Sequence, residues 1–271
     1  MQRYKILISY DGTNYAGWQV QKNGIAIQPL IQKAIETVLR CSINLSGSGR
    51  TDAGVHALSQ VAHFDTSENF NTHRFLLSIN ALLPVEIRVY SIEKVPNDFH
   101  ARYSASAKIY HYHLHLDPVT DPFTCLYSHH VTVPCNLTLL EKATTYFLGT
   151  HDFTSFASKP HRGTASYDPI RTLTRLDVIP KQGGIYLAFE ADGFLYKMVR
   201  NITGTLLDIA QEKMKAAELP DIFLAKDRKR AGTSAPPQGL FLMEVKYSLT
   251  TQSGECLLQG PSPTKDDAQG R

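Results

Sequence analysis

A single carboxylate, Asp52, lies in a short polar loop whose neighbours are almost all small residues. The run around it reads Ser46-Gly47-Ser48-Gly49-Arg50-Thr51-Asp52-Ala53-Gly54-Val55-His56-Ala57. An ionised carboxylate is costly to bury unless a cation or hydrogen-bond donors hold it, and Arg50 lies two positions before it. Glycines let a large ligand approach the backbone closely. The loop therefore has what a catalytic nucleophile or base needs for a bulky substrate, although an ordinary turn has a similar composition.

The overall composition is that of an ordinary globular protein. The chain has 271 residues, of which 42% are hydrophobic and 20% charged, enough for one large domain or two of ordinary size. No apolar run approaches the roughly 20 residues that a membrane helix needs, and the N-terminus carries no secretory pattern. We therefore expect a cytoplasmic protein with no membrane partner. The four cysteines are far apart and form no C-x-x-C pair, which argues against a zinc ribbon.

Basic residues gather in two local groups, although the net charge is only +3. The groups are Lys159, His161, Arg162, Arg171 and Arg175, and Lys226, Arg228, Lys229 and Arg230. Basic patches with aromatic residues nearby suit a folded RNA, because phosphate contacts supply affinity and unstacked bases bind to rings. Charge runs are also typical of solvated surfaces, so these groups alone support RNA binding only weakly.

Alternating strand and helix patterns predict an α+β fold. In the first half, the expected elements are strands at 4–10, 59–66 and 87–92 and helices at 29–40 and 72–82. In the second half, they are strands at 108–116, 170–179, 185–191 and 239–247, helices at 137–148 and 194–214, and a long polar loop at 149–169. The expected division is an N-terminal half at 1–104, a C-terminal half at 105–248 and a disordered tail at 249–271.

Three further patterns have more than one interpretation. His111, His113 and His115 share one face of a predicted strand, but without a cysteine or carboxylate at diagnostic spacing a solvated or RNA-facing surface is favoured over a metal site. The glycine-rich loop lacks the G-K-[ST] ending of an ATP-binding loop. Arg200 lies nearly opposite the apolar face of the helix predicted from Phe194. Helical periodicity does not decide whether Arg200 faces solvent or a cleft, where it could pair with Asp52.

Several short motifs, in order along the chain, resemble the TruA-type tRNA pseudouridine synthases over about residues 4–247. They are Tyr10-Asp11-Gly12 with Tyr15-Ala16-Gly17-Trp18-Gln19, Gly49-Arg50-Thr51-Asp52-Ala53-Gly54-Val55-His56, Asp98-Phe99-His100-Ala101-Arg102-Tyr103-Ser104-Ala105, Tyr110-His111-Tyr112, Phe194 with Met198-Val199-Arg200-Asn201-Ile202, and Ala235-Pro236-Pro237-Gln238-Gly239-Leu240. Six ordered motifs make coincidence implausible, and the string around Asp52 is highly specific in that context.

The resemblance implies both a fold and an activity. The implied fold has two similar α/β halves around a largely antiparallel sheet, with a basic cleft between them. The implied activity is isomerisation of uridine to pseudouridine in the anticodon arm of tRNA, at nucleotides 38, 39 and 40. It further implies a homodimer that grips tRNA across both subunits, and neither a metal nor an organic cofactor.

Roles for individual residues also follow from the resemblance. Asp52 is the implied nucleophile or base, and Arg200 is its implied ion-pair partner. Tyr110 is the ring expected to stack on a flipped uracil, with acceptance of the C5 proton as a second possible role. Arg50 is expected to help extrude that base. Substrate contacts are expected from Arg50, Arg102, Lys108, Tyr110, Lys159 and Arg162. Relatives often carry two arginines where this chain has Lys108-Ile109, and lysine lacks the planar fork of arginine, so a phosphate contact there would be weaker or moved.

Two other functions compete with this interpretation. An RNA-binding module or tRNA folding chaperone would keep the basic patches but would not need Asp52. A glycoside or nucleoside hydrolase could use Asp52, but most such enzymes place two carboxylates around the bond they cleave. The nearest acids, Asp65 and Glu68, come only after the next predicted strand.

Overall fold

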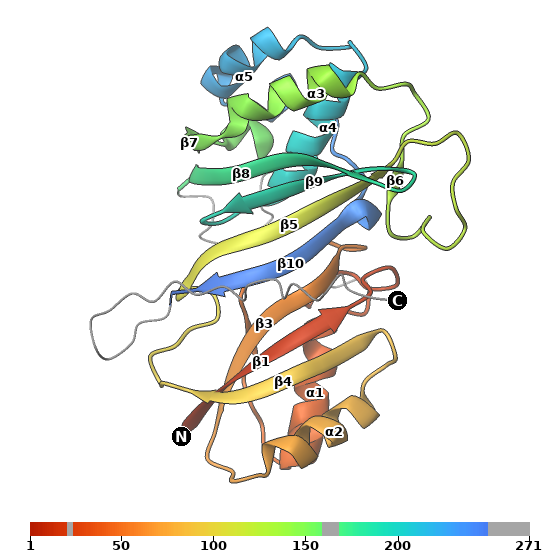
Figure 1. Ribbon diagram of the computed structural model, residues 1–271. Helices are drawn as coiled ribbons and strands as arrows, with labels where there is room; N and C mark the ends of the chain where they lie inside the picture. Colours follow the sequence, from red (N-terminus) through yellow and green to blue (C-terminus); the bar gives the residue numbers. More distant parts are fainter. Residues whose placement is uncertain (21–23, 159–167, 249–271) are drawn as a thin grey trace, which may run out of the picture.

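One mixed, mostly antiparallel sheet runs through the whole molecule, in the order β4-β1-β3-β10-β5-β9-β8-β7 (Figure 1). A computed structural model describes residues 1–20, 24–158 and 168–248. The strands are β1 (Gln2–Tyr10), β2 (Ser46–Gly47), β3 (His56–Thr66), β4 (Ile87–Val95), β5 (Ala105–His115), β6 (His129–His130), β7 (Gly149–Asp152), β8 (Ile170–Lys181), β9 (Gly184–Ala191) and β10 (Leu240–Tyr247). The predicted α+β class with a largely antiparallel sheet is confirmed.

The helices form two groups, one at each end of this sheet (Figure 1). At one end lie α1 (Ile27–Leu39) and α2 (Thr72–Leu82), and at the other α3 (Leu137–Thr144), α4 (Met198–Ala210) and α5 (Leu219–Ala225). Helix α1 buries one face of its cylinder, at Ile27, Ile31, Ala34 and Ile35, which is the spacing that a 3.6-residue period requires. Helix α2 begins where the side chain of Asn71 accepts a hydrogen bond from the Arg74 N–H, a typical N-cap.

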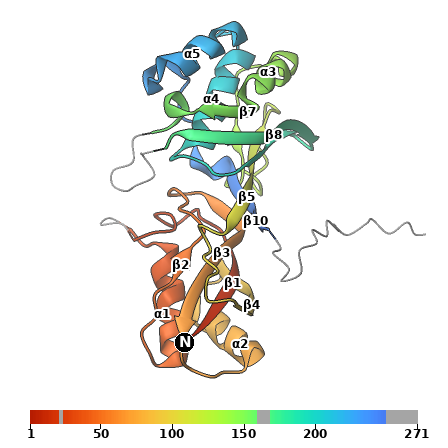
Figure 2. The same cartoon turned by 90° about the vertical axis from the view of Figure 1, so that its left-hand side faces the viewer.

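Strands β3, β10 and β5 lie between the two groups of helices (Figure 2). Strand β10 pairs antiparallel with β5 along most of its length but parallel with β3 through only two residue pairs, Phe241 with His56 and Leu242 with Ala57. The Asp52 loop leads directly into His56, so it reaches this central region at the start of β3. The middle of the sheet therefore brings together residues that are distant in the chain.

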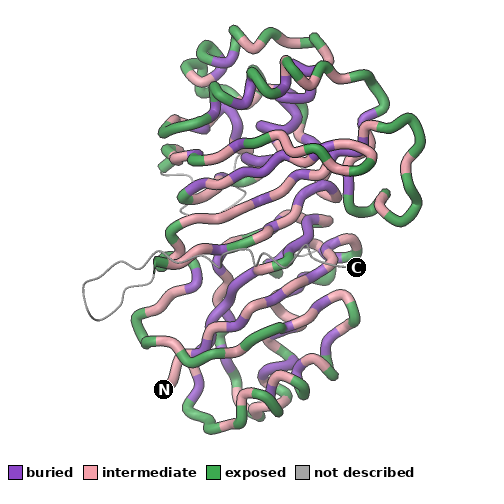
Figure 3. Tube along the Cα trace, viewed as in Figure 1, coloured by how far each residue is buried: buried purple, intermediate pink, exposed green. Residues whose placement is uncertain are grey.

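Strand β5 alternates between a buried and a partly exposed face. Tyr110, Tyr112 and Leu114 are 8%, 0% and 0% exposed, respectively, whereas the intervening His111 and His113 are half-buried. Successive side chains of a strand point to opposite faces, so this confirms the predicted alternation. Buried residues follow the central strands, while the chain between β5 and β6 is largely exposed (Figure 3).

Several predicted boundaries were wrong, each for a local reason. The helix expected from Phe194 begins at Met198, because Lys197 has a left-handed backbone with φ of 60°. The loop expected at 149–169 contains β7, which pairs with the edge of β8. Asn201, which follows Arg200 on α4, is fully buried. Its Nδ2 donates to the Phe156 carbonyl, and its Oδ1 accepts from Arg228 Nη2. The tail expected from 249 lies outside the described residues.

No helix among residues 1–20, 24–158 and 168–248 is long and apolar enough to span a bilayer. In the same part of the chain, no three histidine, cysteine or acidic side chains are grouped as a metal site would require. The histidines of β5 instead contact protein groups. His111 and His113 pack against the ring of Tyr186, and His115 Nε2 lies 2.8 Å from the Val119 carbonyl.

Candidate active site

Asp52 and Arg200 form an ion pair, with Arg200 Nη1 2.7 Å from Asp52 Oδ2. The side chains remain 16% and 11% exposed, respectively, so the pair is sheltered but can be reached from solvent. Arg200 lies in the first turn of α4, and its Nε donates to the Ala235 carbonyl at 2.7 Å. The Ala235 N–H in turn donates to the Arg200 carbonyl at 3.0 Å. The guanidinium is thus oriented by two acceptors, as its planar fork allows.

Buried polar contacts fix the loop that precedes Asp52. The Ser48 N–H donates to the Val61 carbonyl at 2.7 Å, and the Ser48 hydroxyl donates to Gln60 Oε1 at 2.6 Å. Gln60 Nε2 then donates to the Gly49 carbonyl at 3.1 Å. Because Ser48 and Gln60 are fully buried, these contacts hold the backbone firmly three and four positions before Asp52.

Residues near the N-terminus of the chain also fix Thr51, the residue that precedes Asp52. Thr51 Oγ1 shares a 2.8 Å hydrogen bond with the Tyr10 hydroxyl, and the Thr51 carbonyl accepts from the Trp18 N–H at 3.2 Å. Gly17 has φ of 92°, and a Cβ there would lie 2.4 Å from the Thr51 carbonyl oxygen. Only glycine permits both this conformation and this approach. The motif at Gly17-Trp18 therefore supports the Asp52 loop directly.

The Asp52 charge contributes to the raised pKa of Tyr110. Burial, the neighbouring Tyr10 and the Asp52 carboxylate together raise the pKa of Tyr110 far above its ordinary value. The phenol is consequently a neutral hydrogen-bond donor at physiological pH. Its ring is packed edge-to-face against Phe194, with centroids 5.1 Å apart.

Tyr196 is a further side chain at the ion pair, and the sequence patterns did not single it out. It is 39% exposed. Burial and the Asp52 charge raise its pKa, while the Arg200 charge opposes this shift, which places the phenol near both groups. Lys197 Nζ lies 5.3 Å from the centre of its ring. The only signal was its position between Phe194 and Met198, where an exposed aromatic ring interrupts the apolar pattern.

The expected substrate-binding cations differ in their surroundings. Arg50 is exposed and, within the described ranges, has neither an ion pair nor a side-chain hydrogen bond. Arg102 is also exposed, with its guanidinium 5.6 Å from the ring of Tyr103. Lys108, in contrast, donates from Nζ to the Ser48 carbonyl at 2.7 Å. Lys159 and Arg162 lie outside the described residues.

His56, which ends the Asp52 motif, has a structural environment. It is 1% exposed and stacks on Phe241 with ring centroids 4.5 Å apart. Burial lowers its pKa, and its Nδ1 accepts a hydrogen bond from the Gly12 N–H at 3.0 Å. The same Nδ1 lies 3.1 Å from Asp11 Oδ1. His56 connects the Asp11-Gly12 turn to the start of β3.

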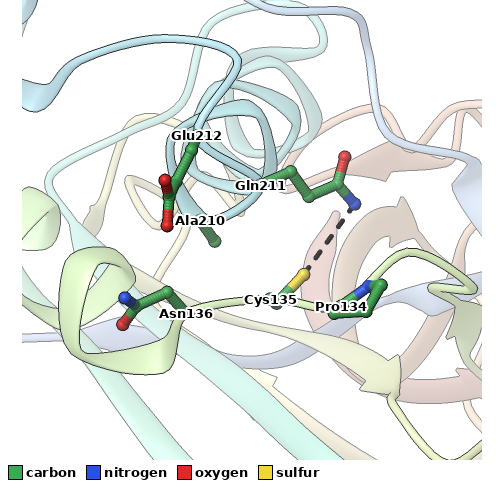
Figure 4. Close-up of a pocket in the computed structure, with 6 residues that line it drawn as sticks. All are labelled: Pro134, Cys135, Asn136, Ala210, Gln211 and Glu212. Carbon is green, nitrogen blue, oxygen red and sulfur yellow. Dashed lines mark hydrogen bonds between the residues drawn. The ribbon is translucent and has the colours of Figure 1, made fainter.

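A separate open pocket lies between the start of α3 and the end of α4 (Figure 4). It is lined by Pro134, Cys135, Asn136, Ala210, Gln211 and Glu212. Within it Gln211 Nε2 contacts Cys135 Sγ at 3.8 Å. Ala210 lies ten positions after Arg200 on α4, which corresponds to about 15 Å along a helix. The pocket is therefore distinct from the Asp52–Arg200 pair.

Comparisons with known proteins show which family the chain resembles. A family model described as tRNA pseudouridine synthase matches residues 6–104 and 143–248. A protein named tRNA pseudouridine synthase A 1 from Protochlamydia amoebophila is 53% identical over 248 residues, which cover 91% of this chain and 97% of that protein. Proteins named tRNA pseudouridine synthase A from Thermoanaerobacter sp. and Acetivibrio thermocellus are 42% and 40% identical, each over 91% of this chain and 100% of their own.

Among solved structures, the chain matches one titled "Crystal Structure of a Cbf5-Nop10-Gar1 Complex". The match covers 88% of this chain and 57% of the other chain, with 12% sequence identity and a TM-score of 0.34. That similarity is too low to support an argument. The family model covers most of the chain and includes the Asp52 loop and Arg200, but not residues 105–142, where Tyr110 lies. The relatives match over 91% of the chain, and together these matches show the family. This chain belongs to the tRNA pseudouridine synthase family, isomerases that act on tRNA.

Proposed function

We propose that this chain converts uridine to pseudouridine at nucleotides 38, 39 and 40 of tRNA, with Asp52 as the catalytic carboxylate. The observation that carries the proposal is the sheltered ion pair of Asp52 and Arg200, 2.7 Å apart, with its carboxylate near enough to help raise the pKa of the buried Tyr110. A lone carboxylate fixed by a guanidinium, next to an aromatic ring, suits a reaction on a single base. A hydrolase with two opposed carboxylates is disfavoured, since Arg200 rather than an acid faces Asp52.

The reaction requires little beyond positioning and one carboxylate. The bond from ribose C1′ to uracil N1 breaks, the base turns, and C1′ bonds to C5. The proton on C5 is then lost while N1 gains one, so substrate and product are isomers and no donor group is consumed. Asp52 either attacks C1′ or uracil C6, or removes the 2′ proton. In each case Arg200 orients the carboxylate toward the target nucleotide.

The target uridine must leave its stack, at a cost of a few kcal/mol that is smaller near a loop. Arg50, which is exposed and two residues from Asp52, is placed to help extrude or replace it. Tyr110 would then stack on the detached uracil, and such stacking is worth roughly 1–3 kcal/mol. Its raised pKa favours this role over accepting the C5 proton, because the phenol already holds its own proton.

The proposal extends to how tRNA is gripped. Arg50 and Arg102 are exposed and suited to backbone phosphates, and Lys159 and Arg162 are assigned the same role from the sequence. We further propose a cytoplasmic homodimer that holds one tRNA across both subunits. Each subunit would present two lobes, one at 1–104 with the Asp52 loop and one at 105–248 with Tyr110 and Arg200, and tRNA would lie between them.

The experiment measures tritium release from tRNA labelled at uridine C5, combined with mapping of pseudouridine at nucleotides 38–40. The wild-type chain should release tritium and modify those nucleotides, whereas Asp52→Asn should do neither. A matched control is Asp177→Asn, which removes an exposed carboxylate from β8. Free uracil as the product would favour the hydrolase, and modification at other nucleotides would refute the assigned positions.

A further inference from the structure

Strand β5 contacts the loop that leads to Asp52 and the Ala235-Pro236 segment that orients Arg200. On β5, Lys108, Tyr110 and Tyr112 occupy alternate positions and hence one face. Lys108 Nζ donates to the Ser48 carbonyl at 2.7 Å, in the loop that leads to Asp52. The Tyr112 hydroxyl donates to the Pro236 carbonyl at 2.7 Å, in the segment that orients Arg200. Tyr110 lies between these two contacts, roughly 7 Å from each along the strand.

We propose that Lys108 and Tyr112 are positioning residues, which hold the Asp52 loop and the Ala235-Pro236 segment in register on either side of Tyr110. This inference rests on the proposed function, because it concerns the placement of Asp52 and Arg200. It assigns Lys108 to the protein backbone, whereas the sequence alone suggests that Lys108 contacts substrate. It also gives a functional reason for the Tyr110-His111-Tyr112 motif beyond its first tyrosine.

The surroundings of Lys108 fit an anchor better than a phosphate contact. Its amine is held against the loop at Gly49, where an added Cβ would lie only 2.8 Å from Nζ. Burial and the neighbouring charges of Arg102 and Arg171 lower the pKa of Lys108 to about 8. Within the described residues no carboxylate pairs with this lysine. Gln60 donates to the Gly49 carbonyl and Lys108 donates to the Ser48 carbonyl. The two side chains thus fix two consecutive backbone carbonyls before Asp52.

The surroundings of Tyr112 connect it to Arg200 through one short segment. Tyr112 is fully buried, and burial raises its pKa far above the ordinary value, so the hydroxyl remains a donor. It binds the Pro236 carbonyl, and the adjacent Ala235 accepts from Arg200 Nε and donates to the Arg200 carbonyl. A shift of this segment would therefore move the guanidinium relative to Asp52.

The test compares Lys108→Met and Tyr112→Phe with two matched controls at exposed side chains, Lys33→Met on α1 and Tyr90→Phe on β4. We expect kcat to fall about 10- to 100-fold in the first two variants, since a misplacement near 1 Å can cost that much. The KM for tRNA, and the slope of log affinity against log salt, should match the controls. Lys108→Arg, which keeps a cationic donor, should recover much of the lost kcat.

Gly49→Ala tests the same contact in a chain that still has Lys108. The new methyl would displace the flexible amine rather than backbone, so the fold should tolerate it. If the amine acts through Ser48, the double variant Gly49→Ala/Lys108→Met should be no slower than Lys108→Met alone, because the two changes remove one contact. Multiplied losses in kcat would mean that Gly49 acts separately and would reject the anchor.

Two outcomes would overturn the positioning role directly. A shallower salt slope for Lys108→Met, by about 0.7–0.9 as expected for one lost phosphate contact, with kcat unchanged, would make Lys108 an RNA contact. Wild-type kcat in both Lys108→Met and Tyr112→Phe, in a preparation where Asp52→Asn is inactive, would reject the inference but leave the proposed function intact. Turnover by Asp52→Asn would instead reject the proposed function itself.

Discussion

The guanidinium of Arg200 lies 2.7 Å from the carboxylate of Asp52, although 148 positions separate them in the chain. The two partners come from different halves of the chain. Asp52 lies in the loop before β3, and Arg200 lies in the first turn of α4. An ion pair assembled from such distant segments depends on the whole fold, which makes it sensitive to single substitutions on either side.

Replacing Asp52 with Asn should abolish turnover while tRNA binding is retained. The amide keeps the shape of the carboxylate but is neither a nucleophile nor a base of comparable strength. Binding should persist because only one negative charge is lost from a surface that attracts phosphate. The measurements are tritium release for turnover and filter retention of labelled tRNA for affinity. A variant with even a few per cent of the wild-type rate would contradict the catalytic role of Asp52.

Replacing Arg200 should reduce the rate more than the stability. Arg200→Lys keeps the charge but cannot bind Asp52 and the Ala235 carbonyl at once, so we expect kcat to fall at least about tenfold. Arg200→Ala should lose about 100-fold, similar to removal of a preorganised donor elsewhere. Because the pair is partly exposed, the free energy of unfolding should drop by only about 1–2 kcal/mol. Calorimetry and single-turnover kinetics on the same samples separate the two effects.

Equal rates for the wild type and Arg200→Lys would show that charge alone suffices and that the fork geometry is unimportant. Arg175→Lys is a suitable control, because Arg175 pairs with Asp177 on the exposed part of β8. Its rate should not change.

Local patterns predicted the elements well where local chemistry sets their ends. Helix α2 was expected at 72–82 and is found there, because Asn71 caps its first turn and Pro84 follows its last. The alternation of β5 was equally readable, since a strand with one buried face must alternate in polarity. The resemblance also anticipated the contact between Asp52 and Arg200, which periodicity alone left undecided.

Features that depend on tertiary contacts could not be predicted in this way. Helix α4 begins late because Lys197 adopts a left-handed conformation, for which lysine has no intrinsic preference. Strand β7 is a short polar edge strand, with no hydrophobic alternation to reveal it. Tyr196 joins the site, and Lys108 turns inward to Ser48, only because segments far apart in sequence meet at the centre of the sheet.

Replacing the exposed cations should weaken tRNA binding in a salt-dependent way. For Arg50→Gln and Arg102→Gln we expect the slope of log affinity against log salt to become shallower by about 0.7–0.9 for each lost phosphate contact. Arg50→Gln should also lower kcat, because Arg50 is assigned to base extrusion. Binding is measured by fluorescence anisotropy between low and moderate salt. The control is Arg74→Gln on α2, at the far end of the molecule. If a tested variant shows the same slope as this control, the replaced arginine does not contact a tRNA phosphate.

His63 should make stability fall as the solution is acidified. It is 5% exposed, and its Nδ1 accepts from the Ala101 N–H at 3.2 Å. Burial, His100 and Arg3 lower its pKa to about 4 from an ordinary 6.5. His63 is therefore protonated below about pH 6.5 in the unfolded chain but only below about pH 4 in the folded chain. Between these pH values the unfolded state binds more protons, so the free energy of unfolding decreases as pH falls from about 6.5 to about 4. The loss should reach about 2–3 kcal/mol near pH 4.5, since each pKa unit corresponds to about 1.4 kcal/mol.

Urea unfolding followed by fluorescence of the buried Trp18 measures this effect at pH 7.5 and pH 4.5. His63→Gln should be less stable than the wild type at pH 7.5, because a buried acceptor is altered, but it lacks the titrating group. The difference in unfolding free energy between the two proteins should therefore shrink toward pH 4.5. The exposed His73→Gln should instead keep the pH dependence of the wild type. If the wild type and His63→Gln lose stability in parallel, the acid sensitivity belongs to other groups, of which the half-buried His113 is the first to examine, because burial lowers its pKa to about 4 as well.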